Sequence, residues 1–137
     1  MYLEQFNFDI KYEEECECGN LISLEEFKNI PFEIKRVYYI YGADPSVSRG
    51  AHAHKESNQV LISVHGSCEI LLDDGKEQKR VVIDKPNKGL LQKSMIWGEM
   101  QHFSEDCVLM VIADSFYSVD DYIRDYDQFL ELVKVDV

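Results

Sequence analysis

The sequence predicts an all-β domain, a sandwich or barrel of short strands, followed by one helix at the C-terminus. From residue 34 onward, short runs rich in β-branched and aromatic residues succeed one another, and turn residues separate them. After residue 119 the apolar residues recur at three and four positions, which is typical of a helix. The length of 137 residues fits a single domain, 1–137, with its barrel core at about 30–115.

Each predicted strand is a β-type run with turn residues at its ends. The first, at 34–41, is dominated by aromatic and β-branched residues. Asp74-Gly75 closes a hairpin, because an Asp-Gly pair suits the tight turn between two antiparallel strands. The remaining predicted strands are 59–64, 68–72, 79–83, 89–92, 95–97 and 107–113.

The predicted C-terminal helix spans about 119–134. Its apolar stripe runs along one face and packs on the barrel. Ser118 and Asp121 form a capping pair at its start, where acidic residues also suit the positive end of the helix dipole. A second, short helix is predicted over 23–28, with Ser23 as its cap.

Charge and composition exclude several classes of function. Lys and Arg number 14 against 26 Asp and Glu, and the net charge of −12 argues against non-specific nucleic-acid binding and against anionic membranes. We find no apolar run of the ~20 residues that a membrane helix needs and no signal-peptide pattern, so we expect a cytoplasmic protein. The four cysteines are then expected to be free thiols, with a soft-metal site at Cys16-Glu17-Cys18 as an open alternative.

The most informative motif is His52-Ala53-His54. If this segment is extended, its period of two places both imidazoles on the same face. Histidine has an ordinary pKa of about 6.5, so it can take and return a proton near neutral pH. We therefore interpret His52 and His54 as proton carriers, with an exposed pair on a loop as the alternative.

The spacing around the histidines argues against a metal site. It matches the first cupin motif, in which metal-binding members carry glutamate at the position of Gln59. The stretch 93–98, where a second cupin motif supplies another histidine, contains none. Two imidazoles and a neutral amide fall short of the three protein ligands of an open metal site. The sequence therefore predicts no metal, and we expect no other cofactor.

Further candidates lie on either side of the histidines. Arg36 and Tyr38 share one face of the predicted strand 34–41, so a cation and a phenol can point inward together. Arg49 and Lys55 flank the histidines and are able to hold phosphate oxygens, arginine through a bidentate fork. A core aromatic, for Tyr38, and ordinary surface charges, for Arg49 and Lys55, remain the alternatives.

Several segments, in order, resemble the nucleotide-sugar 3,4-ketoisomerases, cupin enzymes that act on dTDP-4-keto-6-deoxyglucose. The matching segments are 34–41, 49–55, 66–75, 97–109 and 121–126. The resemblance implies a cupin or jelly-roll β-barrel and a homodimer that exchanges N-terminal strands. It also implies a dTDP-linked keto-sugar as substrate.

The same resemblance assigns roles to individual residues. It implies His52, His54 and Tyr38 as catalytic groups, and Arg36 and Arg49 as neighbours of the diphosphate. Lys55, Gln59 and Trp97 complete the candidate substrate-binding set.

The chain also departs from that family. Residues 13–19 are acidic and bear cysteines where an Asp-x-Arg-Gly start is usual, and 91–95 lacks the usual proline. Gly98 and Gln101 replace histidines that are common beside Trp97 and Met100.

The hypothesis is that His52 removes the hydrogen on C3 of the sugar and that Tyr38 and His54 stabilise the resulting enediolate. Which histidine is the base remains open. A 3,5-epimerase, a non-catalytic sugar-nucleotide-binding cupin and a metal-dependent cupin dioxygenase are the alternatives.

Overall fold

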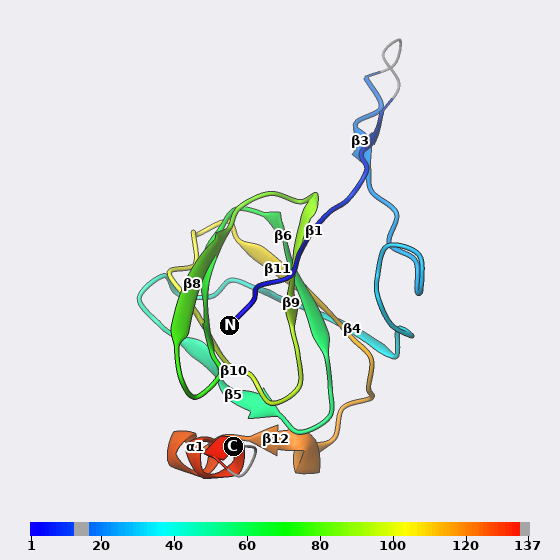
Figure 1. Cartoon of the computed structure of the whole chain (residues 1–137). Helices are drawn as coiled ribbons and strands as arrows, with labels where there is room; N and C mark the ends of the chain where they lie inside the picture. The colour runs from blue at the N-terminus through cyan, green and yellow to red at the C-terminus, as the bar shows by residue number, and fades with distance from the viewer. Residues whose placement is uncertain (13–16, 135–137) are drawn as a thin grey trace.

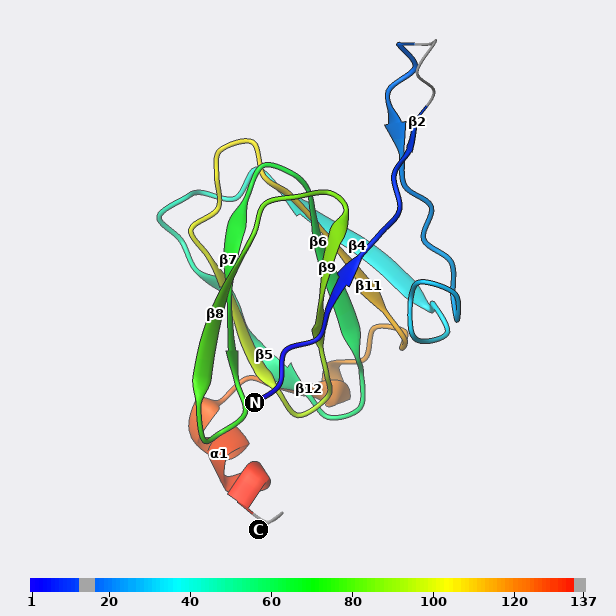
Figure 2. The same cartoon turned by 45° about the horizontal axis from the view of Figure 1, so that its top comes forward.

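Two antiparallel sheets of five strands face each other in the computed structural model, which describes residues 1–12 and 17–134 (Figures 1 and 2). The first sheet has the order β1 (Gln5–Asn7), β9 (Lys88–Gln92), β6 (Gln59–His65), β11 (Val108–Ala113), β4 (Arg36–Tyr41). The second has the order β12 (Tyr122–Ile123), β5 (Arg49–His54), β10 (Trp97–Gln101), β7 (Cys68–Asp73), β8 (Gln78–Ile83). This jelly-roll sandwich confirms the all-β prediction.

The main core lies between the two sheets. Leu61 and Leu109 enter it from the first sheet, and Ile70 and Leu72 from the second, all with at most 2% of their surface exposed. Strand β4 alternates as expected. Its outward residues are exposed, while Arg36, Tyr38 and Ile40 turn toward the interior.

The first sheet is also covered on its outer face. Val60, Ile62 and Ile112 pack there against Phe8 and Ile30 from the N-terminal segment. Because β6 is buried on both faces, its sequence is a continuous apolar run rather than an alternation.

The N-terminal region departs from the predictions. Residues 23–28 form no helix, because Phe27 takes a left-handed backbone (φ 58°) and the N–H groups of Lys28 and Ile30 both donate to the Glu25 carbonyl. Strands β2 (Lys11–Tyr12) and β3 (Asn20–Leu21) form a hairpin that stands away from the sandwich (Figures 1 and 2).

The cysteines only partly follow expectation. Cys68 and Cys107 are free and buried. Cys18 is disulfide-bonded, so the expectation of four free thiols is wrong there. Cys16 lies outside the described residues, and with it the question of a metal at Cys16-Glu17-Cys18.

Most predicted strands agree with the structure to within one or two residues. The exception is the predicted strand 95–97. Met95 has a left-handed backbone (φ 60°), and β10 begins only at Trp97. Among residues 1–12 and 17–134, no helix combines the length and apolar character needed to cross a bilayer.

The predicted helix at 119–134 is wrong in its first half. A 3₁₀ turn covers Val119–Asp121, β12 follows, and the helix α1 is confined to Tyr126–Lys134. Asp121 does not act as part of a cap, because its carboxylate binds His54 and the Glu56 N–H instead. Asp125 takes over the cap, with Oδ1 accepting from the Gln128 N–H at 3.1 Å.

Helix α1 is held to the second sheet by aromatic packing and by one polar contact. Phe129 is fully buried with Trp97 and Ile123. The Tyr126 hydroxyl donates to Asp73 Oδ2 at 2.6 Å, which joins the helix to the end of β7.

Replacing Tyr126 with phenylalanine removes this hydrogen bond and keeps the ring. We expect the free energy of unfolding, measured by urea denaturation, to fall by about 1–2 kcal/mol, because the acceptor is charged and the site is partly exposed. Tyr39→Phe, at an exposed ring, is the matched control and should change it by less than about 0.5 kcal/mol. Wild-type stability in Tyr126→Phe would contradict this role of the hydrogen bond.

Candidate active site

A cavity of about 320 Å³ opens between β4, β5 and the segment that precedes α1. Its lining combines guanidinium groups, phenols and one imidazole with a few apolar atoms. The lining residues are Arg36, Tyr38, Ile40, Arg49, Gly50, Ala51, His52, Met100, Tyr117, Tyr122 and Arg124. Three arginines thus gather around one cavity in a chain of net charge −12, which suits an anionic ligand.

The two histidines of β5 meet inside this region. Their ring centroids lie 4.8 Å apart in an edge-to-face arrangement, with His52 on the cavity wall and His54 buried behind it. Burial, then the neighbouring His54 and the arginines, lowers the pKa of His52 to about 4. His52 is therefore neutral at pH 7 and able to accept a proton.

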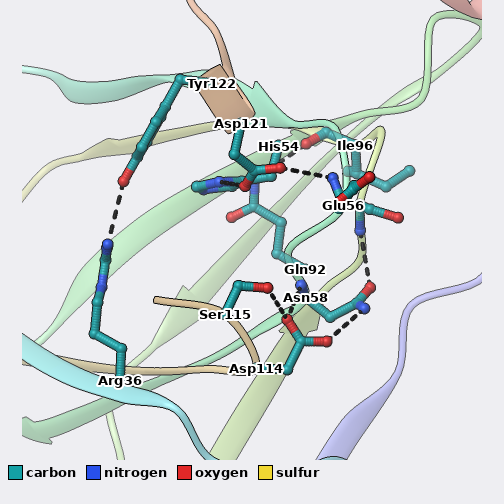
Figure 3. A network of polar contacts seen from close by, with 11 residues as sticks. Arg36, His54, Glu56, Asn58, Gln92, Ile96, Asp114, Ser115, Asp121 and Tyr122 are labelled. Carbon is teal, nitrogen blue, oxygen red and sulfur yellow. Dashed lines mark hydrogen bonds and ion pairs between the residues drawn. The ribbon is translucent and has the colours of Figure 1, made fainter. Parts of the chain in front are cut away.

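Asp121 orients His54. Its Oδ2 lies 3.0 Å from His54 Nδ1, and its Oδ1 accepts from the Glu56 N–H at 2.8 Å (Figure 3). Beside a carboxylate, Nδ1 carries the proton of the neutral ring, which leaves Nε2 with its lone pair. His54 Nε2 is buried and has no hydrogen-bond partner among the described residues.

The environment of His54 sets its protonation. Burial lowers its pKa, and the hydrogen bond and charge of Asp121 oppose that effect. His54 Nε2 is thus a proton acceptor whose protonated form Asp121 stabilises.

Arg36 and Tyr38 form the opposite wall. The Arg36 guanidinium lies 4.3 Å from the centre of the Tyr38 ring and donates to the Tyr122 hydroxyl at 3.3 Å (Figure 3). Burial raises the pKa of Tyr38, and the Arg36 charge opposes the rise. Tyr38 is therefore a neutral phenol that can donate a hydrogen bond.

Not all the predicted site residues come together. Arg36, Tyr38, Arg49 and His52 line the cavity, with His54 directly behind. Lys55 faces a separate hollow beside Asp120 and Asp121. Trp97 is buried beneath α1, and Gln59 is buried at the start of β6, with 1% of its surface exposed, and does not line the cavity.

Four functional candidates were missed from the residues alone. They are Tyr117, Asp121, Tyr122 and Arg124. Asp121, Tyr122 and Arg124 fell inside the predicted helix 119–134, and the apolar stripe of that helix explained the segment without a functional role. The signal that could have found these three was the family match over 121–126, which extends beyond the apolar positions that a helix face requires. No such signal marked Tyr117.

Gly98 is explained by its neighbour Gln92. An added Cβ at Gly98 would lie 2.5 Å from Gln92 Nε2, because that side chain crosses from the first sheet toward β10. The Gln92 amide donates to the Ile96 carbonyl at 3.1 Å (Figure 3). The chain thus places an amide from β9 where a side chain at position 98 would otherwise lie.

The residues present do not fit the metal site of metal-binding cupins. Within residues 1–12 and 17–134, three or more His, Cys, Asp or Glu side chains nowhere gather as a possible metal site. The third cupin position holds the neutral amide of Gln59, so His52 and His54 lack the acidic ligand that would complete an open metal site. His52, with its lowered pKa, and the unpartnered Nε2 of His54 are chemically able to accept protons.

The low pKa of His52 makes stability depend on pH. The folded chain holds this ring with a pKa of about 4, whereas an unfolded histidine titrates near ~6.5. Between these values the unfolded chain binds the extra proton, so stability is lost as the pH falls from ~6.5 toward ~4.

His52→Asn should therefore reduce the loss of unfolding free energy between about pH 7 and about pH 4.5, as measured by urea denaturation. The same pH dependence in the variant and in the wild type would contradict the burial of a neutral ring.

Comparisons with known proteins agree with this geometry. The family model FdtA, described as WxcM-like, C-terminal, matches residues 7–134. A TDP-4-oxo-6-deoxy-alpha-D-glucose-3,4-oxoisomerase of Aneurinibacillus thermoaerophilus is 48% identical over 115 residues, which are 84% of this chain and 83% of that protein.

Solved structures show the same likeness over nearly the whole chain. A 3,4-ketoisomerase from Helicobacter canadensis is 50% identical, with 98% of each chain covered and a TM-score of 0.92. A sugar 3,4-ketoisomerase from Thermoanaerobacterium thermosaccharolyticum, in complex with TDP, is 38% identical, with 98% of this chain and 96% of that chain covered and a TM-score of 0.92. A histidine-to-asparagine mutant of the latter enzyme was solved with TDP-4-keto-6-deoxyglucose. From the fold, the site and these matches, the chain belongs to the WxcM-like FdtA family.

Proposed function

We propose that this chain is a sugar-nucleotide 3,4-ketoisomerase that converts dTDP-4-keto-6-deoxyglucose into a dTDP-3-keto-6-deoxyhexose. The observation that carries the proposal is a neutral His52 on the wall of a cationic cavity, backed by the His54–Asp121 pair. Relatives that act on or bind the TDP-linked keto-sugar support this choice of substrate.

The arginines of the cavity are the proposed diphosphate site. Arg36, Arg49 and Arg124 line it together, and guanidinium groups bind phosphate oxygens through paired hydrogen bonds. The same charges help to keep the pKa of His52 low. A bound diphosphate offsets them, so binding of the substrate makes His52 a stronger base.

The reaction begins with transfer of a proton from carbon. The C4 ketone acidifies the hydrogen on C3, and His52 takes that hydrogen as a proton. The electron pair of the C–H bond forms the C3–C4 double bond, and the negative charge moves to the C4 oxygen. Tyr38 gives its phenolic proton to this oxygen, which yields an enediol.

The second half moves the carbonyl to C3. His54 Nε2 accepts the proton of the C3 hydroxyl, and Asp121 stabilises the imidazolium that forms. The C3–O double bond forms as C4 takes a proton from His52, whose ring exchanges its proton with solvent while the enediol is bound. The proton on His54 then returns to the Tyr38 phenolate, so every group ends in its starting state.

The same proposal includes the assembly and the compartment. A homodimer with exchanged N-terminal strands is supported by the hairpin that projects from the sandwich (Figure 2), where Leu21 is 56% exposed, and by Phe27, 73% exposed. A cytoplasmic location is part of the proposal; the free thiols of Cys68 and Cys107 agree with it, whereas the disulfide of Cys18 is unusual for that compartment.

His52→Asn tests the base directly. With dTDP-4-keto-6-deoxyglucose as substrate, we expect kcat to fall by at least ~10²-fold, while dTDP binding is retained because the arginines remain. His65→Asn, at an exposed turn away from the cavity, is the matched control and should keep wild-type turnover. Near-normal turnover in His52→Asn would rule out the assignment of the base.

Light scattering of the purified protein tests the assembly. We expect a mass of twice the 16.0 kDa chain. Leu21→Asp on the projecting hairpin should shift the protein toward the monomer, because the charge disfavours burial in an interface. Val82→Asp on β8, at a site 60% exposed, is the control and should leave the dimer intact. A monomeric wild type would contradict the exchanged dimer.

A further inference from the structure

A row of polar side chains crosses the inner face of the first sheet below the cavity. Arg36 on β4 pairs in register with Ala113 on β11, Ala113 pairs with Gln59 on β6, and Gln59 pairs with Gln92 on β9. Ala113 is the small member of this row, so it leaves room between the arginine and the amide. Gln59 lies next to it on the sheet, with 1% of its surface exposed.

Gln59 differs from Gln92 in how its amide is satisfied. Gln92 donates to the Ile96 carbonyl at 3.1 Å. Neither Oε1 nor Nε2 of Gln59 has a partner at hydrogen-bond distance within the described parts of the chain. A buried amide without partners lowers stability, and in native proteins such a group calls for an explanation.

The group that faces Gln59 is Tyr38. Burial raises the pKa of Tyr38, and Gln59, as a hydrogen-bonding neighbour of the phenol, makes the smallest of the contributions that oppose this rise, although its amide has no partner at hydrogen-bond distance within the described residues. Tyr38 projects from β4 toward the cavity, and Gln59 comes from β6, two strands away across β11. In the strand register, Tyr38 pairs with Val111 and Val111 with Leu61, two residues from Gln59, so the phenol and the buried amide share the inner face of the first sheet.

We propose that Gln59 is a positioning residue of this enzyme, whose amide holds the Tyr38 hydroxyl while that hydroxyl gives up and regains its proton. The proposal rests on the proposed function. An amide carries both an acceptor and a donor. Oε1 accepts the O–H of the resting phenol, and Nε2–H donates to the phenolate formed when the proton passes to the C4 oxygen.

Other groups also face Tyr38. Arg36 lies over its ring from the same strand, Tyr122 faces it from β12, and His52, Arg49 and Arg124 line the same cavity. The guanidinium groups favour a phenolate through charge. An amide beside the hydroxyl adds a directed hydrogen bond, which fixes the direction in which the phenolic proton leaves.

Gln59→Leu is the decisive variant, because it keeps a similar volume and removes both polar atoms. We expect kcat on dTDP-4-keto-6-deoxyglucose to fall at least ~10-fold, with KM within about twofold of the wild type. We expect the melting temperature to stay level or to rise, because an unpaired buried amide has been removed. Titration of Tyr38, followed by NMR with ¹³Cζ-labelled tyrosine and assigned with Tyr38→Phe, should move to higher pH.

Gln92→Leu is the matched control. It removes a buried glutamine whose amide is satisfied, so its melting temperature should fall, and the titration of Tyr38 should not move. Wild-type kcat in Gln59→Leu, or an unmoved Tyr38 titration, would overturn the role of Gln59. The titration requires no substrate, so a wild-type chain that fails to turn over the sugar would count against the proposed function alone.

Discussion

Partial burial of a neutral imidazole beside three guanidinium groups is the constraint on which the rest of this structure depends. His52 stays unprotonated because desolvation and the cationic wall both penalise its charged form. The mutual repulsion of these cations opposes their gathering in one cavity, and the acidic balance of the whole chain, a net charge of −12, helps to offset it. In the proposed reaction, a diphosphate that binds these cations removes part of the penalty on a protonated His52, so the same charges would couple substrate binding to the basicity of that ring.

The C-terminal segment completes the candidate site with three side chains, those of Asp121, Tyr122 and Arg124. Asp121 binds His54 of β5 and fixes its tautomer (Figure 3). Tyr122 and Arg124 line the cavity. This is possible because Tyr122–Ile123 pairs with β5 as a strand, and because α1 then anchors the segment through Phe129. Stability of the helix and geometry of the site are therefore coupled, although the helix itself touches no reacting group.

The sequence predicted much of this arrangement because strand alternation is a local property. A period of two was enough to bring His52 beside His54 and to turn Arg36 and Tyr38 to the same face. The predicted helix at 119–134 failed because the spacing of its apolar residues does not reveal a contact between Asp121 and His54, which lie 67 residues apart. For the same reason, the positions of Trp97 and Lys55 outside the cavity could not be inferred, since each depends on how distant segments pack.

The central claim is that a buried pair of histidines moves hydrogen between adjacent sugar carbons. Its most direct test is NMR of the product that the wild-type chain forms from dTDP-4-keto-6-deoxyglucose in deuterated water. The account predicts a carbonyl at C3 and solvent deuterium at C4. A product that keeps its carbonyl at C4 and carries deuterium at C5 would contradict it and would instead identify an epimerase.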